Sequence, residues 1–333
     1  MKSRLMAVVL LAFAGAVQAQ GLPKLNINPQ EVSLTGLSSG GYMAVQYHAA
    51  YSSTVRGAGI ISAGPYHCAG DNPGFDDVIR CVTGTPDPAV SVAKLKANAE
   101  AKVIDPLDGF MKSQVYLFWG QADGFLSKAV ADALHAYYAA LLPADQIKYV
   151  DKMNAQHGFI TDNPADEKCE LVGNYFINNC QYDQAGEILQ WIYKGKLKPR
   201  SDKLGGKIVE FEQKTFTGGV ALSFDDKGYA YVPADCAAGE ECKLHIVFHG
   251  CGQGVEAMGD KIYGMSGTGH NRWADSNRIV MLYPQVKKSG GYPYNPMGCW
   301  DWWGYNDNHW DTNKGQQLKV IKGMVDHLTS GRK

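Results

Sequence analysis

The sequence predicts an α/β protein with a mostly parallel central sheet and helices on both faces. Short apolar runs alternate with helix-forming segments along the chain, which is the order that builds parallel strands joined by helices. Polar residues follow several of these runs, and ligands in such sheets bind outside the carboxyl ends of the strands. With 333 residues and a formal net charge of −1, the chain has ample core, and nucleic acid or anionic membranes are not expected partners.

The amino terminus has the pattern of a secretory signal peptide. Residues 1–4 include the basic Lys2 and Arg4, residues 5–16 are apolar, and Val17-Gln18-Ala19 offers a small-residue cleavage site. We expect residues 1–19 to be removed and residues 20–333 to form a single catalytic domain without a separate substrate-binding domain. A retained helix is the alternative, and the apolar run is too short to span a bilayer. The product is expected to be secreted, either outside the cell or into the periplasm, and to be a monomer.

Eight cysteines in an exported chain favour four disulfides. Spacing does not prove their connectivity, and the alternative of a zinc site lacks any Cys-x-x-Cys, so we expect no metal. The sequence-local pairs, together with one distant pair, are Cys68 with Cys81, Cys169 with Cys180, Cys236 with Cys242, and Cys251 with Cys299.

The first strand, expected from Val32, leads into a nucleophile elbow. In Gly36-Leu37-Ser38-Ser39-Gly40 the glycines remove side chains that would block a sharp turn between this strand and a helix over residues 41–51. Such a turn exposes the Ser38 hydroxyl. The helix start leaves N–H groups free, so the amide of Ser39 is placed to stabilise an oxyanion. The motif alone also arises by chance in a chain with 38 glycines, and its strand and helix context favours the elbow.

Two polar residues after later strands complete a candidate triad. Asp123 follows the apolar run 115–120, and His157 follows the short strand 147–150. The order Ser38, Asp123, His157 is the order of serine, acid and histidine in α/β-hydrolases. Asp123 has an alternative role in capping the helix that begins at Ser127. The other expected elements of this half are a strand at 57–62 and helices at 86–101, 127–142 and 185–193.

The second half of the chain holds elements that ordinarily precede the nucleophile. A buried strand at 244–248 runs into His249-Gly250, the usual source of the second oxyanion-hole donor in this fold. Because this strand follows the triad here, the sequence predicts one circularly permuted α/β-hydrolase domain and not two domains. The remaining expected elements are strands at 209–216, 229–233 and 279–284 and helices at 267–277 and 316–328.

Four motifs along the chain resemble those of one family, the extracellular poly(3-hydroxybutyrate) depolymerases of the single-domain, circularly permuted type. They are Gly36-Leu37-Ser38-Ser39-Gly40-Gly41-Tyr42-Met43-Ala44, His249-Gly250-Cys251-Gly252-Gln253, Tyr283-Pro284-Gln285 and Gly298-Cys299-Trp300-Asp301-Trp302. The resemblance covers nearly the whole mature chain. It implies a secreted serine esterase that cuts polyester into hydroxyacid oligomers without a metal or cofactor.

The resemblance also implies roles for particular residues. Ser38 matches the family's nucleophile, Asp123 its acid and His157 its base. The amides of Ser39 and Cys251 match the oxyanion hole. Trp302 matches an aromatic residue of the substrate crevice. A Cys251 to Cys299 disulfide would tie the oxyanion loop, residues 249–253, to the aromatic loop, residues 298–310. Two departures from the family bear on the width of the subsites: Gly252 replaces a larger residue, and the aromatic loop continues through residues 303–310.

The aromatic loop and the substrate leave alternatives open. Four of the seven tryptophans lie between Trp300 and Trp310, where they suit either a polyester groove or an aromatic mini-core. We expect only Trp302 to contact substrate, which would be a polyester chain or its hydroxyacid oligomers. The alternatives are an esterase for acetylated or feruloylated polysaccharide and, in another class, a non-catalytic polymer-binding protein.

Overall fold

A central sheet of eight strands organises the computed structural model of the chain, which describes residues 21–173, 175–259, 261 and 267–332. The predicted signal peptide lies outside these residues. The strand order is β4-β3-β2-β1-β10-β11-β9-β8. The strands are β1 (Ile27–Leu37), β2 (Val55–Ile61), β3 (Gln114–Phe118), β4 (Ile147–Val150), β8 (Lys207–Glu212), β9 (Lys227–Val232), β10 (Cys242–Phe248) and β11 (Ile279–Tyr283).

Pairing in this sheet is mostly parallel. Strand β1 lies at the centre, parallel to β2 on one side and to β10 on the other, and β9 is antiparallel to both β11 and β8. Strands from the second half of the chain therefore extend the sheet on the far side of β1, as the predicted permutation requires. The sequence prediction of a mostly parallel α/β sheet is confirmed.

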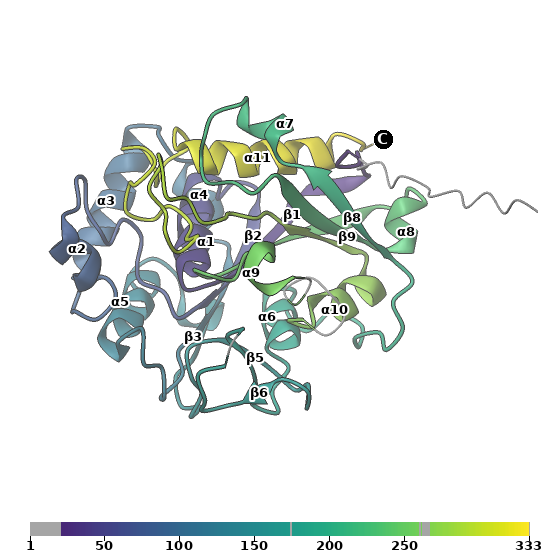
Figure 1. The fold of residues 1–333 in the computed structure, drawn as a ribbon, viewed down its shortest axis with the longest axis horizontal. Coiled ribbons are helices and arrows are strands. Elements are labelled where there is room, and N and C mark those ends of the chain that lie inside the picture. Colours follow the sequence, from purple (N-terminus) through teal and green to yellow (C-terminus); the bar gives the residue numbers. More distant parts are fainter. Residues whose placement is uncertain (1–20, 174, 260, 262–266, 333) are drawn as a thin grey trace, which may run out of the picture.

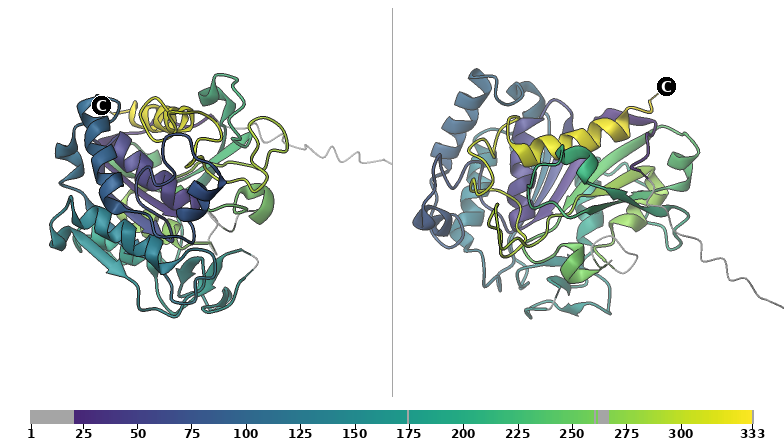
Figure 2. Two further views of the ribbon diagram at one scale, coloured as in Figure 1. Left: turned by 90° about the vertical axis from the view of Figure 1, so that its left-hand side faces the viewer. Right: turned by 45° about the horizontal axis from the view of Figure 1, so that its top comes forward.

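Helices cover both faces of the sheet (Figure 1). Helices α1 and α11 contact β1, whereas α6 contacts β2 and β3, and α10 contacts β11. Figure 2 shows α11 lying across the strands. The helices are α1 (Ser39–Ala50), α2 (Phe75–Arg80), α3 (Pro88–Glu100), α4 (Leu107–Phe110), α5 (Lys128–Ala139), α6 (Gln184–Ile192), α7 (Lys214–Thr217), α8 (Ala234–Ala237), α9 (Val255–Met258), α10 (His270–Asn277) and α11 (Gln316–Thr329), with a 3₁₀ turn at Ala144–Gln146.

Two hydrophobic clusters form the core, one on each face of the sheet. Side chains alternate along a strand, so Ile246 and Phe248 of β10 enter the cluster under α1 and α11, while Val247 enters the cluster under α6 and α10. All three are buried. This alternation fixes the register of β10 and delivers His249 and Gly250 at its carboxyl end.

Two of the segments in which the structure differs from the sequence prediction lie beyond the central strands. The strand expected over 209–216 ends at Glu212, and the chain turns into the short helix α7, which stops at Gly218 with φ 61°. The second cysteine loop carries a small separate sheet of β5 (Phe159–Thr161), β7 (Ile177–Asn179) and β6 (Glu167–Lys168). In the part of the chain that the structure describes, no helix combines the length and apolar character needed to cross a membrane.

Candidate active site

The predicted elbow is present between β1 and α1. Ser38 has φ 56° and ψ −123°, a backbone conformation that residues other than glycine rarely adopt. A Cβ at Gly36 would lie 2.0 Å from the Gly40 carbonyl oxygen, and one at Gly40 would lie 2.3 Å from the Phe248 carbonyl oxygen. Both positions therefore need glycine, and together they hold Ser38 in its strained conformation.

Asp123 and His157 form a close pair at the ends of neighbouring strands. The two carboxylate oxygens of Asp123 lie 3.0 and 2.9 Å from Nδ1 of His157. A carboxylate only accepts hydrogen bonds, so Nδ1 carries the proton and the neutral ring keeps its lone pair on Nε2. The Asp123 side chain is fully buried behind the histidine.

Asp123 also stabilises its own turn, as the capping alternative anticipated in part. Its Oδ1 accepts hydrogen bonds from the amides of Phe125 and Leu126, each at 2.9 Å, whereas the helix cap belongs to Ser127. Burial raises the pKa of Asp123, but the hydrogen bond and charge of His157, together with these amides, outweigh burial and hold the pKa below its usual 3.8. The group is therefore a carboxylate at neutral pH.

A cavity of about 250 Å³ brings the predicted residues together. Ser38, Ser39, His157, Cys251 and Trp302 all line it, and among the described residues the Ser38 hydroxyl makes no hydrogen bond to His157. The remaining lining is mostly apolar and was not identified from the sequence, although some of it adjoins the motifs. These residues are Leu37, Tyr42, Val82, Phe125, Leu126, Phe176, Gly250, Gln253 and Met297.

The peptide group between Gly250 and Cys251 is fixed from behind by His249. Nδ1 of His249 donates to the Gly250 carbonyl oxygen at 2.7 Å, and Nε2 accepts from the Val286 amide at 3.1 Å. The carbonyl of Gly250 and the N–H of Cys251 belong to one trans peptide and point in opposite directions. The histidine thereby sets the direction of the Cys251 N–H. Burial lowers the pKa of His249 to about 4, so the ring is neutral as this bonding pattern requires.

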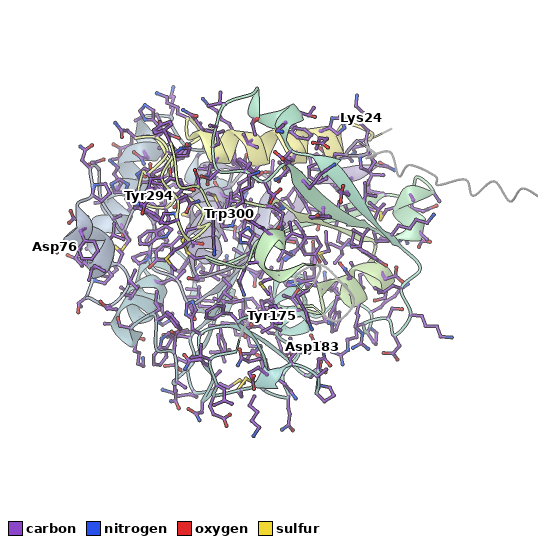
Figure 3. All side chains as sticks on the ribbon, viewed as in Figure 1. Lys24, Asp76, Tyr175, Asp183, Tyr294 and Trp300 are labelled. Carbon is purple, nitrogen blue, oxygen red and sulfur yellow. A yellow bond between two sulfur atoms is a disulfide. The ribbon has the colours of Figure 1, made fainter. Side chains whose placement is uncertain are left out.

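The aromatic loop packs against α1, far from it in sequence. Trp302 stacks on Tyr42 with ring centroids 4.2 Å apart. Trp300 is fully buried, whereas Tyr294, which precedes it in the chain, is exposed; both are labelled in Figure 3. Trp300 therefore belongs to an aromatic mini-core, whereas Trp302 lines the cavity.

The carboxylate of Asp301 organises this loop. It accepts hydrogen bonds from four consecutive backbone amides, those of residues 303–306, at distances between 2.7 and 3.3 Å. Burial raises the pKa of Asp301 to about 7 despite these bonds. The neighbouring Trp302 is consequently positioned by a fully satisfied buried carboxylate.

Two other histidines, His245 and His48, are buried away from the cavity and make only structural hydrogen bonds. His245 contacts Ser33 at 2.7 Å and Thr35 at 2.8 Å, but all three side chains are buried within the sheet, where no polymer could reach them. His48 is buried between Tyr138 and Ser113. Within the described residues, no group of three His, Cys, Asp or Glu side chains is arranged to hold a metal.

The structure forms four disulfides, and they are the four expected pairs. The bond between Cys251 and Cys299 links the loop after β10 to the aromatic loop, so two walls of the cavity are covalently joined.

The parallel sheet, the serine at a strand-to-helix elbow and the paired histidine and aspartate define an α/β-hydrolase-like carboxylic ester hydrolase. Polyhydroxybutyrate depolymerase of Talaromyces funiculosus is 35% identical over 96% of this chain and 95% of its own length. Poly(3-hydroxybutyrate) depolymerase of Delftia acidovorans is 38% identical over 98% of this chain, which spans only 65% of that protein. The chain belongs to the poly(3-hydroxybutyrate) depolymerase family.

Solved structures agree with this assignment. The crystal structure of PHB depolymerase from Penicillium funiculosum matches with a TM-score of 0.86 and 35% identity, covering 94% of this chain and all of the other. A serine-to-alanine variant of a PHB depolymerase, complexed with an R3HB trimer, matches with the same TM-score, 34% identity and the same coverage. No family model matches the chain. The family and fold expected from the sequence motifs are confirmed.

Proposed function

We propose that this chain hydrolyses the ester bonds of poly(3-hydroxybutyrate) or its oligomers with Ser38 as nucleophile, His157 as base and Asp123 as its partner. The observation that carries the proposal is the Asp123–His157 pair, bonded at 2.9 Å, whose histidine lines the same cavity as Ser38. The names of the relatives supply the substrate class. The apolar lining suits a chain of methyl-bearing repeat units.

The reaction proceeds by two acyl transfers. Ser38 Oγ attacks the ester carbonyl carbon while His157 Nε2 takes the hydroxyl proton, and Asp123 stabilises the imidazolium that forms. The oxyanion of the tetrahedral intermediate, formed from the carbonyl oxygen, accepts hydrogen bonds from the amides of Ser39 and Cys251. His157 then protonates the departing alcohol oxygen, which leaves an acyl group on Ser38.

Water completes the cycle. His157 removes a proton from the water as its oxygen attacks the acyl carbon, and a second tetrahedral intermediate forms against the same two amides. Its collapse returns the proton to Ser38 Oγ and releases a hydroxyacid or a shorter chain. Every group in this proposal comes from one copy of the chain, in keeping with the expected monomer.

Export is part of the proposal. Four disulfides suit an oxidising compartment, and the pattern of residues 1–19 supports passage through a secretory route. Processing after Ala19 would be seen by mass spectrometry of the exported protein. A full-length product that stays inside the cell would contradict export.

The test compares the mature protein with Ser38→Ala on a poly(3-hydroxybutyrate) suspension and on a short-chain nitrophenyl ester. We expect the wild type to clear the suspension and the variant to lose at least about a thousandfold in kcat on the ester, because the nucleophile is gone. Labelling by an organophosphonate should occur in the wild type alone.

The possible outcomes separate mechanism from substrate. Undiminished hydrolysis by Ser38→Ala would overturn the nucleophile. Ester hydrolysis without clearing would keep the mechanism and exclude the polymer as substrate, leaving soluble oligomers or polysaccharide esters. Absence of both activity and labelling in the wild type would favour the non-catalytic alternative.

A further inference from the structure

A second cavity, of about 290 Å³, lies at the amino ends of the central strands, at the edge of the sheet opposite the candidate active site. Arg56 is the second residue of β2, Lys243 is the second residue of β10, and Arg278 directly precedes β11. Ser38, by contrast, follows the carboxyl end of the parallel strand β1. We call this cavity, lined also by Glu31, Tyr193, Lys196 and Lys198, the basal pocket.

Positive charge in the basal pocket exceeds negative charge. Five cationic side chains line it, and Glu31 is its single carboxylate, paired with Arg56 at 2.8 Å. Arg278 pairs with Glu240 at 3.1 Å. In the part of the chain that the structure describes, the lysines at positions 196, 198 and 243 have no carboxylate within ion-pair distance. Three cations of the basal pocket therefore lack a direct ion-pair partner among the described residues, in a protein whose net charge is −1.

Part of this charge is withdrawn from water. Lys243 is half-buried, and burial lowers the pKa of its ammonium, with Arg278 and Arg56 adding to the effect and Glu31 and Glu241 opposing it. Its Nζ lies 3.4 Å from the carbonyl oxygen of Asn277, a weak contact. Since water solvates this ammonium poorly, an anion placed beside it would gain more than at an exposed lysine.

Two of the cations that line the basal pocket, Arg56 and Lys243, lie against one aromatic ring. The Nε atom of Arg56 is buried and, within the described residues, has no hydrogen-bond partner. Its guanidinium lies 5.2 Å from the centre of the Tyr193 ring, and Lys243 Nζ lies 5.7 Å from that centre. Tyr193 therefore holds both cations at one wall.

We propose that the basal pocket binds a multivalent oxyanion of the phosphate or sulfate class. A tetrahedral oxyanion presents acceptors in several directions, so it serves a guanidinium and lysines on different elements at once. A single carboxylate carries half the charge and reaches fewer of these donors. The ligand leaves the substrate cavity free because the two sites lie at opposite ends of the strands, and the proposal stands independently of the catalytic one.

The test titrates the mature protein with inorganic phosphate by calorimetry, against sodium chloride at matched ionic strength. We expect saturable phosphate binding that weakens as ionic strength rises. Lys243→Gln and Lys198→Gln should each raise Kd about tenfold, because each removes one charge-assisted hydrogen bond. Lys152→Gln, which removes an exposed charge near the end of β4, should leave Kd unchanged.

Because Lys198 is exposed, Lys198→Gln should not destabilise the fold. Lys243 is half-buried, so thermal unfolding is used to check that Lys243→Gln is folded. Glucose 6-phosphate distinguishes two sources of the ligand: binding equal to or tighter than phosphate indicates a phosphate ester on a larger molecule, and phosphate binding alone indicates the free ion. The proposal is overturned if neither compound binds more strongly than chloride, or if folded Lys243→Gln and Lys198→Gln bind as the wild type does.

Discussion

His249 shows how a single buried side chain controls a backbone group that faces the cavity. Its ring spans two peptide groups, donating to the Gly250 carbonyl and accepting from Val286. Gly250 is held from its other side as well, since its N–H donates to Gln253 Oε1 at 2.7 Å. The Cys251 amide is therefore oriented before any substrate arrives, and an oxyanion hole needs such preorganised donors.

Replacing His249 tests this positioning. We expect His249→Ala to lower kcat about ten- to a hundredfold with a smaller change in KM, because a misdirected amide weakens transition-state stabilisation. Asparagine places its amide nitrogen where Nδ1 lies, so His249→Asn should recover part of kcat. His309→Ala, at an exposed position of the aromatic loop, is the control. Unchanged kcat in His249→Ala, or equal kcat in the alanine and asparagine variants, would show that the ring does not orient the amide.

At the scale of the element, the aromatic loop depends on one carboxylate. Four amides of residues 303–306 converge on Asp301, and Gln46 of α1 donates to the Asp301 carbonyl oxygen at 3.0 Å. This anchoring keeps Trp302 stacked on Tyr42 at the cavity wall. A change in Asp301 should therefore appear in substrate binding before it appears in the chemical step.

Asp301→Asn should raise KM about three- to tenfold at pH 8, because the new NH₂ group confronts one of the four amides and leaves it unsatisfied. The pKa of Asp301 is raised to about 7, so the wild type is itself largely protonated at pH 6 and has also lost an acceptor there. The ratio of the variant's KM to that of the wild type should thus be smaller at pH 6 than at pH 8. Asp235→Asn, exposed on α8, is the control. A ratio that is the same at both pH values would contradict the role of the carboxylate.

The sequence predicted those elements whose patterns are long or whose turns are chemically marked. Apolar runs such as residues 115–118 gave the central strands, and Gly36 and Gly40 marked the elbow because no Cβ fits there. The strands β5, β6 and β7 escaped prediction, since two or three residues carry no periodicity. Strand β8 stops before the predicted end because the chain enters α7.

Within the site, residues inside motifs were predictable and their neighbours were not. Asp123 and His157 follow strands, and Trp302 lies in a recognised motif. Phe176 and Met297 reach the cavity only through the folding of loops that no local pattern describes. The basal pocket is similar, because its five cations come from four separated segments that only the sheet brings together.

At the scale of the whole molecule, buried neutral histidines couple the fold to pH. Burial lowers the pKa of His48 to about 3, of His270 to about 3 and of His249 to about 4, and that of His245 falls well below 6.5. Each stays neutral in the folded chain but takes up a proton in the unfolded chain below about pH 6.5. Asp301 has the opposite effect on stability. Between about pH 4 and 7 its carboxyl binds a proton in the folded chain but not in the unfolded chain, so this group stabilises the fold as pH falls.

The four histidines outweigh this one carboxyl, so the free energy of unfolding should be highest above about pH 6.5 and should fall as pH decreases toward 4. Each histidine contributes about 1.4 kcal/mol per pH unit in that range. Urea unfolding of the disulfide-intact protein at pH 7.5 and pH 5.5 measures the effect. In His48→Gln, the slope of unfolding free energy with pH should drop by about one histidine's share, since the ring between Tyr138 and Ser113 no longer titrates. A wild-type slope in His48→Gln would mean that His48 is protonated in the folded chain.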